Sequence, residues 1–201
     1  VSGGHTDLVL MKSHGNLEWI GGTRDDAAGE CFDKTARLLG LEYPGGPSIA
    51  REAEKYFKGA GLKLFPRPML NDDNFDWSFS GLKTAVLRAV EKQKSLDVPR
   101  LSAEIQEAIV DVLVEKTLRA VKKFKPRSLL LAGGVAANLR LREKFQKEIA
   151  RRKIKIDFFV PPPPLCTDNA TYIAASAYFV HSPTEWQRLE ANPELTIVGQ
   201  I

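Results

Sequence analysis

The chain has 201 residues, enough to bury a sizeable core as one large or two small domains. Its net charge of +4 and pI near 9.0 permit a nucleic-acid partner without requiring one. Two cysteines exclude a disulfide framework, and no apolar run reaches transmembrane length. We therefore expect a protein of the reducing cytoplasm with no membrane partner.

The chain begins with Ser2-Gly3-Gly4-His5-Thr6 directly after Val1, without an initiator methionine, and we expect it to be part of a longer protein. Small residues with free N–H groups are suited to cradle a phosphate, although a flexible chain end has the same composition. Apolar runs at 8–11 and 17–20 then flank a turn-like His14-Gly15-Asn16, which predicts a β-hairpin.

Two helices are predicted next. Asp25 and Asp26 are typical caps for a helix ending at Gly40, whose buried face comprises Ala28, Phe32, Ala36 and Leu39. Pro47 suits the first position of a second helix, from Ser48 to about Lys58. Gly45 and Gly46, just before it, either bring backbone close to a ligand or simply make the turn.

The middle of the chain predicts an exposed, loop-rich insertion at about 59–80, followed by a helix at about 82–94. The longest helix is predicted from Pro99 to Phe124, and Pro126 ends it. Its core-facing residues are expected to be Leu101, Ile105, Ile109, Val112 and Val121.

A buried strand, a Gly133-Gly134 turn and a helix from Leu139 to Arg152 are predicted after it, with apolar residues every four positions. Such a turn admits a ligand closely, but many α/β proteins turn a corner in this way. A second strand follows at 154–160, then an extended run at 161–164 and a helix capped by Thr167-Asp168 that runs through about Phe179. The alternation of strands and helices indicates the α/β class.

Three polar side chains are candidates for chemistry, each with a structural alternative. The Asp33 carboxylate is suited to two ribose hydroxyls, or it is a solvated helix residue. Asp168 is suited to a hard cation, or it caps a helix. Asn138 carries the same ambiguity because asparagine is a good cap.

The remaining charged residues are less informative. The three histidines lack the spacing of helix-borne metal ligands. Basic clusters at 122–127 and 151–153 are explained by solvated helix ends as well as by an RNA surface.

Taken together, several segments in a fixed order resemble the TsaD/Kae1/Qri7 family of tRNA threonylcarbamoyladenosine transferases, once described as glycoproteases, with the bacterial-type branch fitting best. The resemblance runs from Val1 to about Ala177. The segments that carry it are VSGGHT (1–6), DDAAGE (25–30) with FDK (32–34), LGL (39–41) with YPGGP (43–47), FPRPM (65–69), FSGLKT (79–84), LAGGVAAN (131–138) and CTDN (166–169).

The resemblance implies an actin-like, sugar-kinase and Hsp70 ATPase-type (ribonuclease H-like) fold, with a mixed sheet flanked by helices. Residues 1–201 would be the second, C-terminal lobe of a two-lobed protein. The implied reaction transfers threonylcarbamoyl from threonylcarbamoyl-AMP to N6 of adenosine 37 in tRNAs that read codons beginning with A. At matching positions, the adenylate would be bound by Val1, Ser2, Gly3, Gly4, Asp33, Gly46 and Asn138.

By the same resemblance Asp168 would hold one divalent metal, for which iron or zinc is the first choice and magnesium a further alternative. The family's His-x-x-x-His motif, which supplies its other ligands, is missing from this sequence, so the metal would be incompletely liganded. We therefore expect a fragment that is inactive in isolation. Implied partners are tRNA and, in bacteria, the actin-like paralogue TsaB and the ATPase TsaE.

One alternative function stays open, and two others have no support in the sequence. A non-catalytic actin-like nucleotide-binding or scaffold subunit of the same tRNA-modification complex is the alternative, and retention of Asp33, Asn138 and Asp168 together argues against it. A peptidase has no support from a nucleophile, base or zinc motif. A sugar or acetate kinase would share the lobe, but nothing favours it.

Overall fold

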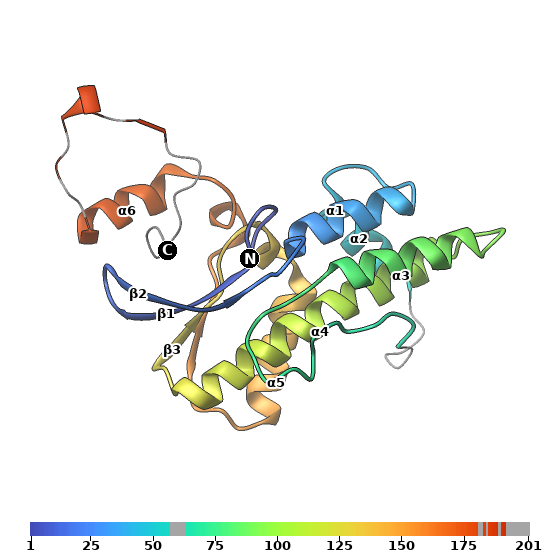
Figure 1. Ribbon diagram of the computed structural model, residues 1–201, viewed down its shortest axis with the longest axis horizontal. Coiled ribbons are helices and arrows are strands. Elements are labelled where there is room, and N and C mark those ends of the chain that lie inside the picture. Colours follow the sequence, from blue (N-terminus) through green and yellow to red (C-terminus); the bar gives the residue numbers. More distant parts are fainter. Residues whose placement is uncertain (57–62, 181–182, 184, 189, 192–201) are drawn as a thin grey trace.

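The computed structural model describes residues 1–56, 63–180, 183, 185–188 and 190–191. The chain begins with an antiparallel hairpin of β1 (Asp7–Ser13) and β2 (Asn16–Gly22), as predicted. A second pair, β3 (Ser128–Leu130) and β4 (Asp157–Phe159), is parallel, with Ser128 opposite Asp157. The strands of the described residues therefore form two small two-stranded sheets, with helices packed beside them (Figure 1), and the α/β class is confirmed.

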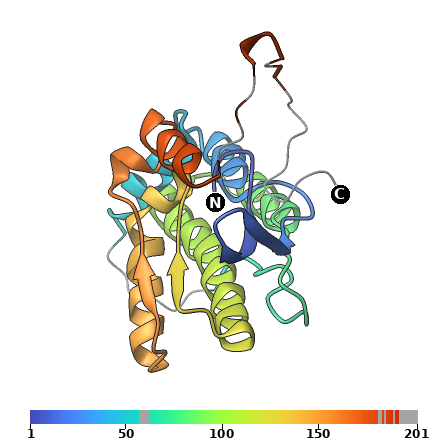
Figure 2. The same cartoon turned by 90° about the vertical axis from the view of Figure 1, so that its left-hand side faces the viewer.

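Helix α4 (Val98–Phe124) is the centre of the packing, and its predicted bounds are confirmed to within a residue. Its predicted core face is buried throughout, because residues three and four apart share one side of a helix. Helices α1 (Ala28–Leu38), α2 (Gly45–Ala53), α3 (Ser80–Glu91) and α5 (Leu139–Arg151) all pack against it, as Figures 1 and 2 show.

The predicted bounds of one helix and one strand, and the predicted conformation of the proline run at 161–164, are wrong. Helix α2 begins at Gly45 rather than Ser48, so Pro47 occupies its third position, and it ends at Ala53; residues 57 and 58 lie outside the described part. Strand β4 is shorter than 154–160. The proline run is not extended throughout, since the short 3-10 helix η2 spans Pro163–Leu165.

The predicted cap of the last long helix is also wrong. Helix α6 (Ala170–Val180) begins after Asn169, whose side-chain oxygen accepts hydrogen bonds from the backbone N–H groups of Thr171 and Tyr172. Every residue of α6 is exposed, unlike those of the other long helices. Beyond it, the described residues hold the 3-10 turn η3 (Trp186–Arg188), and the rest of the predicted tail lies outside them.

The predicted insertion is loop-rich but not simply exposed. Residues 59–62 lie outside the described part, and residues 63–79 form no helix or regular strand, only an isolated bridge between Trp77 and Thr23. Phe65, Trp77 and Phe79 are nevertheless buried in the core. The buried Lys116 of α4 donates hydrogen bonds to the Met69 carbonyl and the Asn74 side chain, which fastens the loop onto the helix.

Asp25 does not cap α1, which begins after Ala27 with no side-chain cap bond. Its carboxylate instead accepts hydrogen bonds from the backbone N–H groups of Phe79 and Ser80 at 2.7 and 3.2 Å, and from the hydroxyls of Ser78 and Ser80. It therefore satisfies free N–H groups at the start of α3 from a distant part of the chain. Burial by itself would raise the pKa of Asp25, but these hydrogen bonds outweigh it and the pKa is lowered.

We predict that Asp25→Ala lowers the free energy of unfolding by about 1–2 kcal/mol at pH 7. Because the pKa of Asp25 is lowered in the folded protein, this stabilisation is complete above its ordinary range near 4 and is lost as the pH falls through the folded value. Urea unfolding from pH 7 to pH 2.5 should therefore show the two proteins converging at acid pH. Asp73→Ala, at an exposed carboxylate, is the matched control; an equal effect there would contradict this role.

Candidate functional site

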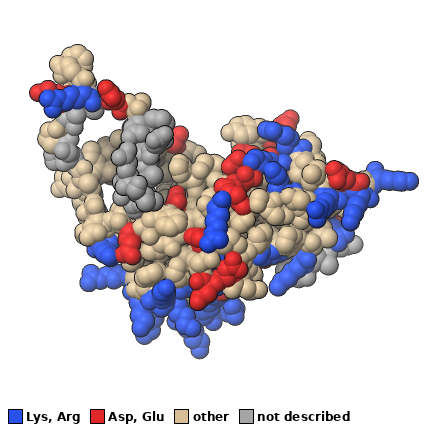
Figure 3. Space-filling view, in the orientation of Figure 1, with Lys and Arg blue, Asp and Glu red and all other residues tan. Residues whose placement is uncertain are grey.

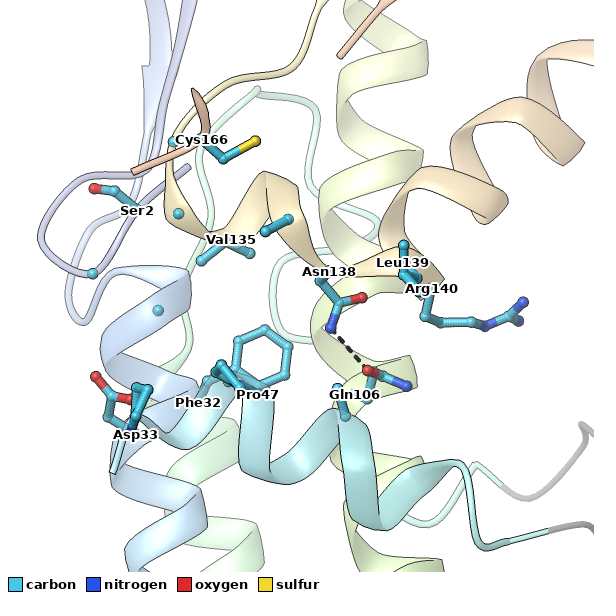
Figure 4. A pocket seen from close by; sticks show the side chains of 18 of the residues that line it. Ser2, Phe32, Asp33, Pro47, Gln106, Val135, Asn138, Leu139, Arg140 and Cys166 are labelled. Carbon is cyan, nitrogen blue, oxygen red and sulfur yellow. Dashed lines mark hydrogen bonds between the residues drawn. The ribbon is translucent and has the colours of Figure 1, made fainter. Parts of the chain in front are cut away.

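A cavity of about 1600 Å³ opens where the amino-terminal segment meets the carboxyl end of β3. Its walls come from the loop at 2–4, from α1 and α2, from one side of α4, from the Gly133 turn with the start of α5, and from the segment 161–172. Figure 4 shows part of this wall, with Ser2 and Asp33 on one side and Asn138 and Arg140 on the other. Predicted site residues that line it are Ser2, Gly3, Gly4, Asp33, Gly46, Asn138 and Asp168.

Val1 is a predicted site residue that supports the cavity rather than lining it. Its nitrogen donates to the Ala132 carbonyl at 2.7 Å, and its carbonyl accepts from the Val135 N–H at 3.1 Å. Gly133 lies between these contacts with φ of +94°, and a Cβ there would lie 2.3 Å from the Val1 carbonyl oxygen. Only glycine fits this close approach without strain.

The loop at Gly3 and Gly4 presents unused backbone donors. Ser2 closes the loop, because its N–H donates to the His5 carbonyl at 2.7 Å and its Oγ accepts from the His5 N–H at 3.0 Å. In the part of the chain that the structure describes, no protein acceptor pairs with the N–H of Gly3 or Gly4. Both residues are exposed and line the cavity, so an anion there would find two free donors.

Asp33 holds two helices together and still faces the cavity. Its Oδ1 accepts a hydrogen bond from the Gly45 N–H at 2.7 Å, at the start of α2. Gly45 is required for packing, since a Cβ there would lie 2.5 Å from the Asp33 Cα. Gly46 is not, because its nearest neighbour would be 4.0 Å away, and it lines the cavity. Of the two glycines, the first makes the turn and the second borders open space.

Asn138 is the cap of α5, as one of its two interpretations predicted. Its Oδ1 accepts from the Leu141 N–H at 2.9 Å, and its Nδ2 donates to Gln106 Oε1 at 2.8 Å (Figure 4). One Nδ2 hydrogen remains for a ligand. Helix capping explains why position 138 is an asparagine. After the bonds to Leu141 and Gln106, the side chain has a single N–H donor left for a ligand in the cavity.

Asp168 does not cap a helix, so that interpretation is wrong. It is exposed and lines the cavity, and its Oδ1 accepts a hydrogen bond from the Tyr172 hydroxyl at 3.3 Å. The described residues contain no group of three or more His, Cys, Asp or Glu side chains that could hold a metal ion. Because one carboxylate is too few for a metal centre, the residues present do not by themselves fit a bound metal.

Arg142 positions the segment that carries Asp168. Its Nε donates to the Ala136 carbonyl at 2.6 Å, and its Nη2 donates to the Pro161 carbonyl at 2.8 Å and contacts Cys166 Sγ at 3.2 Å. A single guanidinium therefore ties the Gly133 turn to the proline run and to buried Cys166. Asp168 follows Cys166 by two residues and lines the cavity.

An ion-pair network on the α4–α5 side of the cavity was missed by the sequence reasoning. Glu107 accepts from Arg140 and from Lys144 at 2.8 Å, and Asp111 accepts from Lys144 and from Arg67 at 2.8 Å. Burial would raise the pKa of Glu107, but the bonds from Arg140 and Lys144 outweigh it and lower the pKa. A sequence signal existed, because acids and bases recur at four-residue spacing on the two helices.

We predict that substitution by alanine destabilises the protein at Gly133 but has almost no effect at the adjacent Gly134. Gly133→Ala should lower the free energy of unfolding by about 2 kcal/mol or more, because it combines a positive φ with a backbone collision. Gly134→Ala meets no atom within 4 Å and should change stability by no more than about 0.5 kcal/mol. Chemical denaturation of both variants measures this, and equal losses would contradict the proposed packing of Val1 on Gly133.

Comparison with known proteins supplies the family. A family model described as "TsaD: tRNA N6-adenosine threonylcarbamoyltransferase" matches residues 1–175. Curated relatives named tRNA N6-adenosine threonylcarbamoyltransferase are 47% identical in Bacillus cereus and in Geobacillus kaustophilus, and 46% identical in Geobacillus thermodenitrificans. Each match covers 98% of this chain and 58% of the relative, so the chain spans less than two thirds of their length. The chain belongs to the TsaD family.

Proposed function

We propose that this chain contributes the nucleotide-binding half-site of an enzyme that makes threonylcarbamoyladenosine in tRNA. The observation that carries the proposal is the cavity, in which free glycine N–H groups and a carboxylate on α1 border one space. The glycine N–H groups are suited to bind a phosphate, and the carboxylate is suited to bind ribose hydroxyls. The family match and the name of the relatives, tRNA N6-adenosine threonylcarbamoyltransferase, support the same function.

In the proposed reaction the donor is threonylcarbamoyl-AMP. N6 of the tRNA adenosine attacks the carbamoyl carbon, the bond from that carbon to the phosphate oxygen breaks, and AMP leaves while N6 loses a proton. The N–H groups of Gly3 and Gly4 would hold the phosphate and stabilise the charge that it gains as a leaving group. Asp33 would hold the ribose with its second oxygen, while Gly46 and Asn138 would border the rest of the nucleotide.

Further assignments rest on the resemblance. We propose that residues 1–201 form the second lobe, and that Asp168 contributes one ligand to a divalent metal, iron or zinc, whose other ligands come from outside this chain. TsaB and TsaE are the proposed bacterial partners, and the cytoplasm is the proposed compartment because tRNA is the substrate. Within the described residues, no helix combines the length and the apolar character needed to cross a membrane.

A chimera tests this proposal. The matching segment of the Bacillus cereus relative is replaced by this chain, and threonylcarbamoyladenosine in tRNA is measured by mass spectrometry. We expect the chimera to modify tRNA, and the isolated chain to modify none. In the chimera, Asp33→Asn keeps the acceptor for the Gly45 N–H but loses the charge, so kcat/KM should fall about 10–100-fold.

The matched control is Asp73→Asn in the same chimera, which should retain full activity because Asp73 is exposed and does not line the cavity. An inactive chimera beside an active parent would contradict the proposal. So would modification by the isolated chain, or an unchanged kcat/KM in Asp33→Asn.

A further inference from the structure

The fold brings two basic clusters of the sequence to one end of the molecule. Helix α4 leads through residues 125–127 into β3, and α5 leads through residues 152–156 into β4. Because β3 and β4 are parallel neighbours, both connections lie at the beginning of the strands, and the Asp157 N–H donates to the Arg127 carbonyl at 3.4 Å. Figure 2 shows the two strand arrows starting together beside the carboxyl ends of the two helices.

The cations of this end are exposed and largely unpaired. Figure 3 shows Lys and Arg gathered along the lower edge of the molecule, where α4, α5 and β3 meet in Figure 1. No carboxylate of the described residues lies within ion-pair distance of seven of them. We call these seven the basic end: Lys122, Lys123, Lys125, Arg127, Lys147, Lys153 and Lys155, all exposed.

Ordinary helix electrostatics does not account for the whole set. A cation in the last turn stabilises the carboxyl end of a helix, which explains Lys122 and Lys123. Arg151 and Arg152 are neutralised by Glu148 and Glu115. Four of the seven, however, lie beyond the helices in the connections to the strands, and two of these, Arg127 and Lys155, are three or more residues past the last helical residue, where that effect has faded. Their charges remain directed to solvent.

Backbone conformation gives a second, independent observation. Lys125 and Lys153 have φ of +50° and +54°, a left-handed conformation that glycine or asparagine normally occupies where a helix ends. Among the described residues, Met69 is the one other non-glycine residue with a positive φ. Both chain exits at this end thus carry a lysine where glycine would be less strained.

We infer that the basic end docks the phosphodiester backbone of RNA. Lysine and arginine without carboxylate partners are the groups that neutralise phosphates, and their spread over two connections suits a continuous polyanion. The end is about 20 Å from the cavity along the 13 residues of α5, whose first turn is at the cavity. Modules that bind double-stranded RNA contact about 16 base pairs, a footprint longer than this separation. One RNA molecule is therefore long enough to contact both the cavity and the basic end.

This inference deepens the proposed function by assigning a surface to its tRNA substrate, and its test is separate. Binding of fluorescent tRNA to the 201-residue chain is measured by anisotropy between 50 and 300 mM KCl. The basic-end variant changes Lys122, Lys125, Arg127 and Lys153 to Gln. The control changes Arg37, Arg88, Lys92 and Lys94 to Gln, which are equally exposed, unpaired in the described residues and elsewhere on the surface.

The basic-end variant should bind tRNA at least about tenfold more weakly at 100 mM KCl, and the slope of log K against log salt should flatten by about 3. The control should stay within about twofold of the wild type. Lys125→Gly with Lys153→Gly removes two cations while relieving the left-handed positions, so tRNA affinity should fall without a lower melting temperature.

Equal losses in the basic-end and control variants would overturn the inference, because they would show attraction by net charge alone. Retained tRNA affinity in the basic-end variant would also overturn it. Binding of each variant to anionic lipid vesicles is measured as well, and a basic-end variant that loses vesicle binding but keeps its tRNA affinity would contradict the assignment to RNA. AMP binding by each variant is measured in parallel. It should not change, so a failure of the cavity to bind nucleotide is distinguished from a failure of the basic end.

Discussion

The packing of the first four residues against the Gly133 turn is the contact on which the rest of the site depends. Val1 makes two backbone hydrogen bonds with the end of β3 and the turn, and the Ser2 carbonyl accepts from the Gly29 N–H at 3.0 Å. Thr6, two residues beyond Gly4, is buried and accepts from the Ala28 N–H at 2.9 Å. The segment thereby joins the start of α1 to the end of β3 and leaves Gly3 and Gly4 over the cavity between them.

This junction places unlike chemical groups around one cavity. Free N–H groups come from the loop, a carboxylate comes from α1, and a wall of paired charges comes from α4 and α5. The paired wall is a poor anion site because its lysine and arginine charges are already balanced by the carboxylates of Glu107, Asp111 and Glu143. The glycine side is therefore the better place for a phosphate, and the wall gives shape rather than net charge.

The sequence predicted what depends on local pattern. The hairpin, α4 and α5 follow from turn residues and four-residue periodicity. The predicted face of α4 is buried, and in α5 the predicted residues Leu141 and Phe145 are buried while Ile149 is half-buried. Resemblance to a family selected eight site residues, seven of which line one cavity although they come from distant segments. Their roles toward a ligand stay predictions.

What the sequence did not reveal depends on partners far along the chain. Asp25 has the position of a cap for the helix that follows it, yet its carboxylate binds the start of α3, more than fifty residues later. Gly45 and Gly46 were equivalent by pattern, and only the approach of Asp33 separates them. Phe65, Trp77 and Phe79 of the loop at 63–79 are buried in the same core as the inner face of α4, where Trp77 Nε1 donates a hydrogen bond to the Val112 carbonyl, and composition does not encode this packing.

If the cavity is a preformed half-site for an adenylate, this chain binds AMP on its own. Titration of the isotope-labelled chain with AMP, followed by amide chemical shifts, tests it most directly. We expect saturable binding in the micromolar to low millimolar range, with the largest shifts together at Gly3, Gly4, Gly46 and Gly134 and little change at the basic end. Absence of saturable shifts at about 10 mM AMP, or shifts confined to residues outside the cavity, would contradict it.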